Sequence, residues 1–543
     1  MKYNNTENTI KTLNDAHTAL KNGDVYQAEH RFKELLKSEP QNLYALDGMG
    51  LIHCQLGDSK KAINFFLEAL ENCSQPNSYN FDNNLANTDK AVILLHLGIA
   101  LHSIGNNNDA LETLQKAYSI IPNSPEIILN LGQLHFELEQ FNEAIGCFKS
   151  LVELQPQNAS AWLTLGYILS LGGFFKNQIN ELHPNELPDL LAAQNESNTN
   201  RKNNQNQSDF NKTKFNETLT ALTNALKLDN SSPDACFYIA ETFRNAEMSH
   251  ESLPYYQRLL QIGKEWPQAV QNYGKALLAT QNLADGWDAM EFRFAAEFGT
   301  WSTHTLPQWS PQNQNNNPKK TKNILAYAED SIASEIMFAS CLPDLINEVD
   351  HCVVECEPSL HSLFKRSFPR ATIVANSHEN IGPTNNSNNI NRESEIEQIA
   401  NQNIRNNNVW GIELDEQIAF GSLPRFFRQH YDTFPLRKSY LIPDYDKVEN
   451  WMNRLTSIGN MPKIGILWKG CWTSESPRQS TVPLAELRNI MLKHQGDAAW
   501  INLQNGSGQK DFETYNRNVS IRLYRFNEIF QYDLDSIAAL LTA

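Results

Sequence analysis

The sequence predicts a helical solenoid followed by two successive α/β units, each built on a parallel sheet. One observation is a unit that recurs every 34 residues in the first half, where Gly98, Gly132 and Gly166 stand at the same repeat position. Another is the alternation of short strand-like and helix-like runs in the second half. The length of 543 residues also exceeds the usual size of one domain, so several domains are expected.

The repeat period is that of tetratricopeptide repeats, and the first half resembles this family. A polar insertion over residues 77–90 lengthens one interval by 14 residues, after which the register resumes. We therefore predict a superhelix of about seven repeats over residues 1–290. The predicted repeats begin near Thr9, Leu43, Ala91, Pro125, Ala159, Pro233 and Pro267.

Each repeat is predicted to be a pair of antiparallel helices, as the fourth repeat illustrates. Apolar residues recur at helical spacing around Gly132 on its first helix, and Phe141, Ala144 and Phe148 share one face of its second helix. Gly132 and Ala144 have no bulk that would hold the two backbones apart. The two helices are therefore expected to cross at these residues.

The fifth repeat is predicted to carry an insertion. Its first helix is expected over residues 159–171, whereas its second helix is expected near residues 215–228. The low-complexity segment between them, residues 173–212, is rich in Asn and cannot bury apolar area. We expect this insertion to leave the superhelix as a disordered loop.

Stacked helical hairpins form a concave groove lined by their first helices, and such grooves bind extended peptides or partner helices. A protein or peptide is therefore the predicted partner. Asn14, Asn130 and Asn272 occupy the same first-helix position in the first, fourth and seventh repeats. They either hold a peptide backbone in the groove or are solvated and stabilise their helices, and the sequence leaves both interpretations open.

The composition argues against nucleic-acid and membrane functions. The chain has 45 Lys plus Arg against 62 Asp plus Glu, a formal net charge of -17, and no basic stripe that would attract a phosphate backbone. No apolar run is long enough to span a bilayer, and the N-terminus lacks a signal core. The eight cysteines have no paired spacing. We therefore expect a cytoplasmic protein without a metal or cofactor.

The second half changes character after residue 290. Residues 291–322 are predicted to form a linker, residues 323–460 a first α/β domain with an Asn-rich loop at 376–408, and residues 461–543 a second, partial domain. Cys352 and Cys356 are predicted to be buried strand thiols. The predicted strands are Ile324–Tyr327, His351–Glu355, Ala371–Val374, Lys463–Trp468, Ala499–Leu503 and Val519–Tyr524.

Several segments of the second half resemble bacterial tetratricopeptide proteins that carry a glycosyltransferase-like region. The segments are Glu335–Leu345, Val354–Leu360 with Arg366–Pro369, Gly421–Arg425 and Gly465–Gly470. Those proteins are similar to heptosyltransferases and, in architecture, to O-GlcNAc transferases. The resemblance implies a GT-B arrangement, in which two Rossmann-like domains bind an acceptor and a nucleotide sugar in the cleft between them.

The resemblance also implies where an acceptor would be activated, and here the sequence departs from the family. A Gly-rich loop of the family is replaced by residues 328–335, which contain no glycine. Ser334 stands where the related heptosyltransferases place a catalytic Asp, and an unperturbed serine cannot act as a general base near pH 7. Glu329 and Glu335 remain as catalytic candidates, although Glu335 is expected to point elsewhere on its helix.

The resemblance further implies a nucleotide-sugar site in the second domain. Lys469 and Gly470 follow the first strand of that domain, and Arg478, Ser480 and Gln504 lie near the family's Arg-Ser and Leu-Gln positions. A βα loop of this kind suits a diphosphate, but similar loops also occur in folds without a ligand. Because residues 461–543 are too few for the family's donor segment, we expect either a fragment or a lost donor site.

Two functions follow from these observations. The first is a protein-binding tetratricopeptide scaffold fused to a glycosyltransferase-like region of doubtful catalytic competence. The alternative is a nucleotide-sugar-dependent glycosyltransferase that acts on a protein or glycan acceptor and is present here as a fragment.

Overall fold

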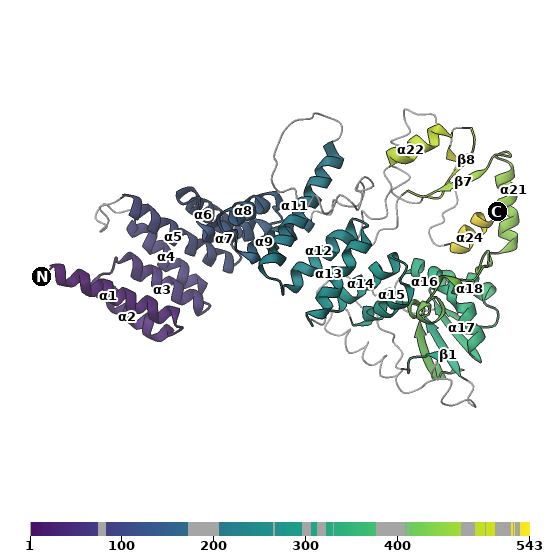
Figure 1. Cartoon of the computed structure of the whole chain (residues 1–543), viewed down its shortest axis with the longest axis horizontal. Coiled ribbons are helices and arrows are strands. Elements are labelled where there is room, and N and C mark those ends of the chain that lie inside the picture. Colours follow the sequence, from purple (N-terminus) through teal and green to yellow (C-terminus); the bar gives the residue numbers. More distant parts are fainter. Residues whose placement is uncertain are drawn as a thin grey trace. The chain divides into compact units, whose positions relative to one another are not determined.

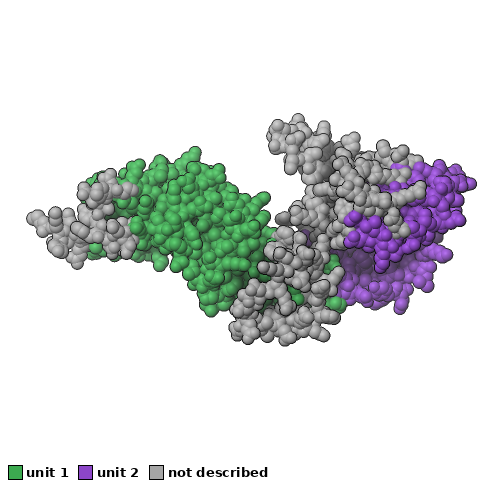
Figure 2. All heavy atoms as spheres, turned by 90° about the horizontal axis from the view of Figure 1, so that it is seen from above, with its two compact units in different colours: residues 1–264 green, residues 265–543 purple. Residues whose placement is uncertain are grey.

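The structure of the protein is a computed structural model, and it divides into two compact units, residues 1–264 and 265–543, which Figure 2 colours separately. The residues that it describes are 2–73, 83–171, 206–263, 266–295, 306–311, 322–329, 331–375, 408–409, 412–468, 484–494, 496–504, 523–524, 526 and 533–543.

The first unit consists of helical hairpins that follow one another along the chain (Figure 1). The paired helices are α1 (Lys2–Lys21) with α2 (Val25–Ser38), α3 (Leu43–Gln55) with α4 (Ser59–Cys73), α5 (Asn83–Ser103) with α6 (Asn107–Ile120), α7 (Pro125–Glu137) with α8 (Phe141–Leu154), α9 (Ala159–Leu171) with α11 (Asn206–Leu228), and α12 (Pro233–Asn245) with α13 (Ser249–Gln261). The predicted helical solenoid is confirmed.

The same residue types begin and end equivalent helices. Asn42 and Ser124 cap α3 and α7 by accepting a backbone N–H with the side chain. The turn between the two helices of a hairpin contains a residue in the left-handed conformation. After α3 this residue is Gly57, with a φ of 77°, and after α7 it is Glu139, with a φ of 58° although it is not a glycine. Hairpin packing therefore imposes this turn even where the sequence does not favour it.

Small residues bring the helices of a hairpin together, as predicted. A Cβ on Gly50 would lie 2.3 Å from Phe66 Cε1, and a Cβ on Gly132 would lie 3.0 Å from Phe148 Cε2. Phe141, which we predicted on the buried face of α8, is 41% exposed. It opens α8 at the hairpin turn, where the ring of Phe136, with centroids 6.0 Å apart, covers only part of it.

Two helices begin earlier than predicted. Helix α11 begins at Asn206, within the predicted insertion at 173–212, and α5 begins at Asn83 rather than near Ala91. Polar residues can extend a helix whose later turns are already fixed by packing. Residues 172–205 of the insertion lie outside the described residues.

The second unit begins with the seventh hairpin, α14 (Pro267–Ala279) and α15 (Leu283–Met290), followed by a 3-10 turn, η2 (Glu291–Phe294). This hairpin packs against the α/β region, where Trp287 Nε1 donates to the carbonyl of Arg428 at 3.1 Å. Within the predicted linker, the amide of Trp309 donates to the carbonyl of Gln417 at 2.8 Å. Residues 306–311 therefore run along the edge of the sheet.

The first sheet has four parallel strands in the order β3-β2-β1-β6. The chain passes from β1 through β2 to β3 on one side and places β6 on the other side of β1. The elements are β1 (Asn323–Tyr327), α16 (Ile332–Phe338), η4 (Ala339–Cys341), α17 (Leu342–Glu348), β2 (His351–Cys356), η5 (Pro358–Leu360), α18 (His361–Ser367), β3 (Thr372–Ala375), the short antiparallel pair β4 (Asn408–Val409) and β5 (Ile412–Glu413), β6 (Glu416–Ala419), η6 (Phe420–Ser422), α20 (Pro424–Phe427) and η7 (Tyr431–Thr433).

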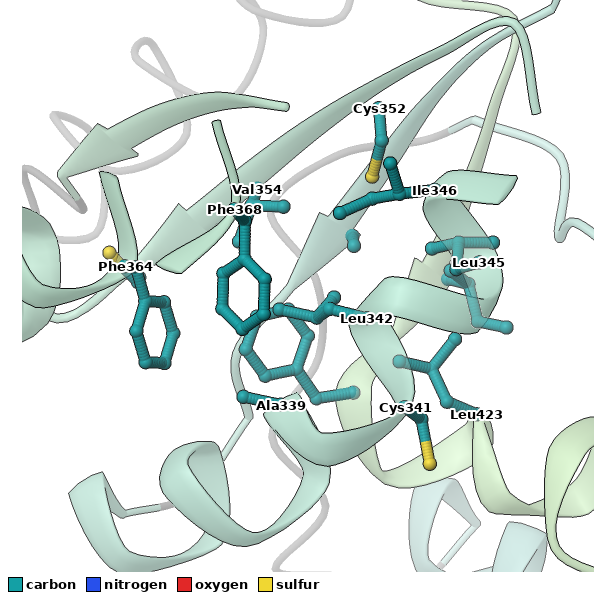
Figure 3. Packing of buried hydrophobic residues seen from close by; sticks show 14 of the residues in the cluster. Ala339, Cys341, Leu342, Leu345, Ile346, Cys352, Val354, Phe364, Phe368 and Leu423 are labelled. Atoms are coloured by element: carbon teal, nitrogen blue, oxygen red, sulfur yellow. The ribbon is translucent and has the colours of Figure 1, made fainter. Parts of the chain in front are cut away.

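The core of this region lies between the sheet and the helices around α17 (Figure 3). Leu342, Leu345 and Ile346 pack with Cys352 and Val354 of β2. The sequence pattern predicts one helix from about Ser334 to Ile346, but the chain forms α16, η4 and α17 there. Pro343 lacks the N–H that would continue a single helix, so α17 begins anew.

Cys352 and Cys356 are buried, as predicted. Burial raises the pKa of the Cys352 thiol to about 12, so this thiol stays protonated at neutral pH. Among the described residues, no cluster of His, Cys, Asp and Glu has the form of a metal site. The described helices include none that is both long and apolar enough to cross a bilayer.

A second, three-stranded parallel sheet has the order β7-β8-β9, which confirms a second α/β region. Ala539 and Leu540 of the last helix pack with Trp451. The elements are α21 (Tyr445–Thr456), β7 (Lys463–Ile466), α22 (Leu484–Lys493), β8 (Ala499–Asn502), β9 (Leu523–Tyr524) and α24 (Leu534–Thr542).

Substitution Gly132→Leu should destabilise the fourth hairpin by about 1 to 3 kcal/mol, because Cys147 and Phe148 leave no room for a side chain. Gly146→Leu on the same hairpin is the control, since a Cβ at Gly146 meets nothing within 4 Å. Amide hydrogen exchange in α7 and α8 measures both changes. Equal protection in the two variants would contradict the packing described for Gly132.

Candidate functional site

A cavity of about 250 Å³ lies at the carboxyl ends of β1 and β6. The strand order reverses between these two strands, and open α/β sheets bind their ligands at such a switch point. The cavity is lined by Gln271 and Lys275 of α14, Trp287 and Met290 of α15, Arg293, Glu329, Ser334, Glu335, Met337, Phe338, Phe420 and Gly421.

A buried ion pair forms one wall of the cavity. Arg293 Nε donates to Glu329 Oε1 at 2.7 Å, and the two side chains are 13% and 7% exposed. Arg293 Nη1 also donates to Glu291 Oε1 at 2.6 Å. Glu329, one of the two catalytic candidates, is therefore neutralised by a guanidinium, which suits a structural role better than proton transfer.

The loop after β6 completes this network. The amide of Gly421 donates to Glu329 Oε2 at 2.7 Å, and Arg293 Nη2 donates to Ser422 Oγ at 2.7 Å. A Cβ on Gly421 would lie 2.6 Å from Glu329 Oε2. The close approach of this backbone to the carboxylate therefore requires glycine.

Glu335 occupies a different environment in the same cavity. It is 7% exposed, and its Oε2 accepts the amide of Glu357 at 3.0 Å. Burial, reinforced by the charges of Glu357 and Glu355, raises the pKa of Glu335 to about 7. Such a carboxyl can both release and accept a proton at neutral pH.

The expectation that Glu335 points away from the site was wrong. Ser334 and Glu335 both line the cavity, because it is wide enough to reach two neighbouring residues in the first turn of α16. Ser331 caps this turn, and its Oγ accepts the amide of Ser334 at 3.3 Å. A capped helix start thus stands where the resemblance implied a Gly-rich loop.

Aromatic and basic side chains form another part of the lining. The rings of Trp287 and Phe338 meet edge to face with centroids 6.2 Å apart. Lys275, from the seventh hairpin, adds an exposed ammonium group near Asn272. The cavity can therefore contact both an apolar ring face and a polar group of a ligand.

Most of the predicted nucleotide-sugar residues, Lys469, Gly470, Arg478 and Ser480, lie outside the described residues. Gln504 is 9% exposed, and its Oε1 accepts the amide of Trp468 at 3.2 Å. It holds the end of β7 beside β8, and a donor-binding role for these five residues stays a prediction.

The three predicted groove asparagines have different surroundings. Asn14 is exposed on α1, whereas Asn130 Nδ2 donates to the carbonyl of Glu126 in its own helix at 2.8 Å. Asn272 is 5% exposed, belongs to the second unit and accepts from Gln268 at 3.2 Å. A shared peptide-binding role stays a prediction.

Comparison with known proteins identifies the repeats. Sequence patterns of the tetratricopeptide repeat match residues 13–75 and 101–166. These matched residues, all in the first unit, are tetratricopeptide repeats. An α/β region follows this tetratricopeptide region, as the sequence predicted.

The chain is also similar to individual proteins. Protein FlbA of Caulobacter vibrioides is 24% identical over 437 residues, which are 78% of this chain and 62% of that protein. A probable UDP-N-acetylglucosamine–peptide N-acetylglucosaminyltransferase, SPINDLY of Hordeum vulgare, is 28% identical over 130 residues, 24% of this chain and 13% of that protein. The chain thus spans about three-fifths of the length of FlbA. The crystal structure of YrrB, a TPR protein with an unusual peptide-binding site, aligns at 14% identity and a TM-score of 0.32 over 44% of this chain and 96% of YrrB.

Sequence reasoning missed Arg293, Lys275 and Trp287. Arg293 and Trp287 lie where the repeat pattern ends, so neither the repeat nor the strand pattern drew attention to them. Gly421 lies in one of the segments that resemble the glycosyltransferase-like proteins, so the sequence did contain a signal for this residue of the cavity.

Substitution Glu335→Gln should remove a pH dependence of stability. Glutamate in an unfolded chain titrates near pH ~4.3, whereas the pKa of folded Glu335 is about 7. Its stabilising contribution is complete below the unfolded pKa and is lost as the pH rises through about 7. The Gln variant should therefore exceed the parent in stability above neutral pH, on the order of 3 kcal/mol, in urea unfolding followed by tryptophan fluorescence.

Two variants complete this test. Glu449→Gln, at an exposed position of α21, should leave the pH profile unchanged. Glu329→Gln should destabilise the second unit by about 2 to 4 kcal/mol at neutral pH, because it breaks a buried ion pair. If Glu335→Gln and the parent show parallel pH profiles, the carboxyl is not protonated near neutrality.

Proposed function

We propose that this protein is a scaffold that binds polypeptides through the first helices of its tetratricopeptide region and carries a glycosyltransferase-like α/β region. The repeats support the binding role, since stacked hairpins form an extended surface for partners. The similarity to SPINDLY and the two parallel sheets support the second part. A GT-B arrangement with two Rossmann-like domains belongs to this proposal.

The observation that carries the binding role is a set of exposed apolar side chains. Ile10, Tyr44 and Val92 stand at the same repeat position on α1, α3 and α5 and are 56%, 43% and 40% exposed. Ile99, seven residues after Val92 on the same helix face, is 38% exposed. Apolar side chains that gather on neighbouring helices favour contact with a partner.

We also propose the domain limits that the sequence predicts: repeats over residues 1–290, a linker over 291–322, a first domain over 323–460 and a second over 461–543. The seventh hairpin is counted with the repeats that it resembles in sequence, although it packs within the second compact unit. A cytoplasmic location is proposed as well. It is supported by the seven cysteines of the described residues, all of which are unpaired.

The double substitution Val92→Glu with Ile99→Glu should weaken polypeptide binding by about tenfold or more, since it places charges in an apolar contact. The immobilised full chain selects binders from a displayed random peptide library, and the affinities of the selected peptides are then measured. The control is Leu67→Glu, which changes a side chain with 46% exposure on the second helix α4. The proposal is refuted if the double variant and Leu67→Glu bind the selected peptides with equal affinity, or if the library yields no binder.

Glu335 favours a second candidate, a nucleotide-sugar-dependent glycosyltransferase. A carboxylate with a pKa of about 7 in a cavity at the switch point suits a general base. The acceptor oxygen would bond to the anomeric carbon while the bond from that carbon to the diphosphate breaks. The acceptor proton would pass to the Glu335 carboxylate, and the nucleoside diphosphate would leave.

A panel of nucleoside diphosphate sugars separates these candidates. The scaffold predicts no turnover by the full chain with any donor, in an assay of released nucleoside diphosphate. The transferase predicts turnover that rises through pH ~7 and is lost in Glu335→Gln, together with saturable donor binding that is lost in Lys469→Ala. Loss of turnover in Glu335→Gln, together with loss of donor binding in Lys469→Ala, would establish the transferase.

A further inference from the structure

Three aromatic rings from successive first helices form a row in the tetratricopeptide region. The centroids of Phe136 on α7 and Tyr167 on α9 lie 5.9 Å apart. Those of Tyr167 and Tyr238 on α12 lie 4.8 Å apart, with the ring planes 39° from parallel. All three rings are partly buried, so they present some of their surface to solvent.

The rings cover the hairpin core rather than belong to it. The core beneath is made by fully buried residues such as Leu165 and Ile168, and Phe136 and Tyr167 pack against its edge. Rings held in this way lose little conformational entropy when a ligand stacks on them. The aromatic row, Phe136 with Tyr167 and Tyr238, is therefore a preformed surface.

The three helices that carry the aromatic row have a net negative charge. Helices α7, α9 and α12 contain four carboxylates, those of Glu126, Glu137, Asp234 and Glu241, and a single cationic side chain, Arg244. Arg244 is itself paired, since its Nη2 donates to Glu241 Oε2 at 2.6 Å.

Burial raises the pKa of Tyr238 first, and the neighbouring Tyr167 and Asp234 raise it further. Of these neighbours, Asp234 carries a negative charge at neutral pH. A cation over the Tyr238 ring would therefore be attracted by the Asp234 carboxylate as well as by the negative face of the ring.

We propose that the aromatic row binds arginine side chains of an extended polypeptide. The proposal rests on the proposed function, because it assigns a ligand chemistry to part of the same first-helix surface. A guanidinium is planar, stacks on aromatic faces and sheds water more easily than the ammonium of lysine. Asp234 and the net negative charge of these helices favour a cationic segment over the neutral proline-rich segments that aromatic grooves also bind.

The test uses peptides of one Gly-Ser sequence in which the same spaced positions hold Arg, Lys, citrulline or Pro. Citrulline has the shape of arginine without its charge. The full chain should bind the Arg peptide about tenfold or more tightly than the citrulline peptide in fluorescence anisotropy, and added salt should weaken the preference. Equal affinities for these two peptides, or tighter binding of the Pro peptide, would overturn the proposal.

Variants locate the site. Tyr167→Leu with Tyr238→Leu keeps apolar bulk but removes the ring faces, and it should abolish the preference for Arg over citrulline. Tyr26→Leu, at a side chain with 87% exposure on α2, is the control and should keep the preference. A preference that survives in the double variant would place arginine binding elsewhere and refute the role of the aromatic row.

The outcome also distinguishes this inference from the proposed function. If library peptides bind and lose affinity in Val92→Glu with Ile99→Glu, while Arg and citrulline peptides bind equally, the scaffold stands and the arginine preference is wrong. If neither the library nor the Arg peptide binds, both are wrong. Circular dichroism of each variant shows whether the helices remain folded.

Discussion

The ion pair between Arg293 and Glu329 connects the end of the seventh hairpin to the end of β1, and the shape of the cavity depends on it. A buried charge pair is retained only if its remaining hydrogen-bonding groups are also satisfied. Ser422 and the amide of Gly421 meet this requirement from the loop after β6. Three segments distant in sequence are thereby fixed around one cavity.

This constraint explains why two glutamates in one cavity differ chemically. Glu329 forms an ion pair with a guanidinium, whereas Glu335 has carboxylates and a backbone amide as its neighbours, and its pKa is raised to about 7. Different environments can give two carboxyl groups different tasks. Here Glu329 belongs to the framework of the cavity, and the raised pKa of Glu335 is the observation on which its proposed role in proton transfer rests.

The tetratricopeptide region obeys a different constraint, which repeats along the chain. In the second to fifth hairpins a glycine of the first helix meets an aromatic or branched side chain of the second helix, as Gly50 meets Phe66. Stability then comes from each hairpin and its neighbours, so the surface residues of the first helices are free to vary. Examples are the exposed apolar side chains of α3 and α5 and the aromatic row on α7, α9 and α12.

The sequence by itself determined the features that depend on short chain segments. The repeat period, the small residues at helix crossings and most strands of the two parallel sheets follow from local patterns of side-chain size and polarity. Strand β6, which pairs with β1 beside the cavity, was not predicted from the sequence. A local pattern also leads to errors, because packing decides whether a side chain is covered, as with Phe141. The helix that is interrupted at Pro343 is an error of another kind, since the proline was present in the sequence.

Only the tertiary structure decided the chemistry of the site. The ion pair of Glu329, the burial of Glu335 and the ring contact of Tyr167 with Tyr238 depend on residues that lie far apart in the sequence. A pKa or an ion pair depends on the distance between charges and on their exclusion from water, and neither quantity is present in the order of the residues. The residue types of the site could be read from the sequence, but their roles arose from the contacts that folding creates.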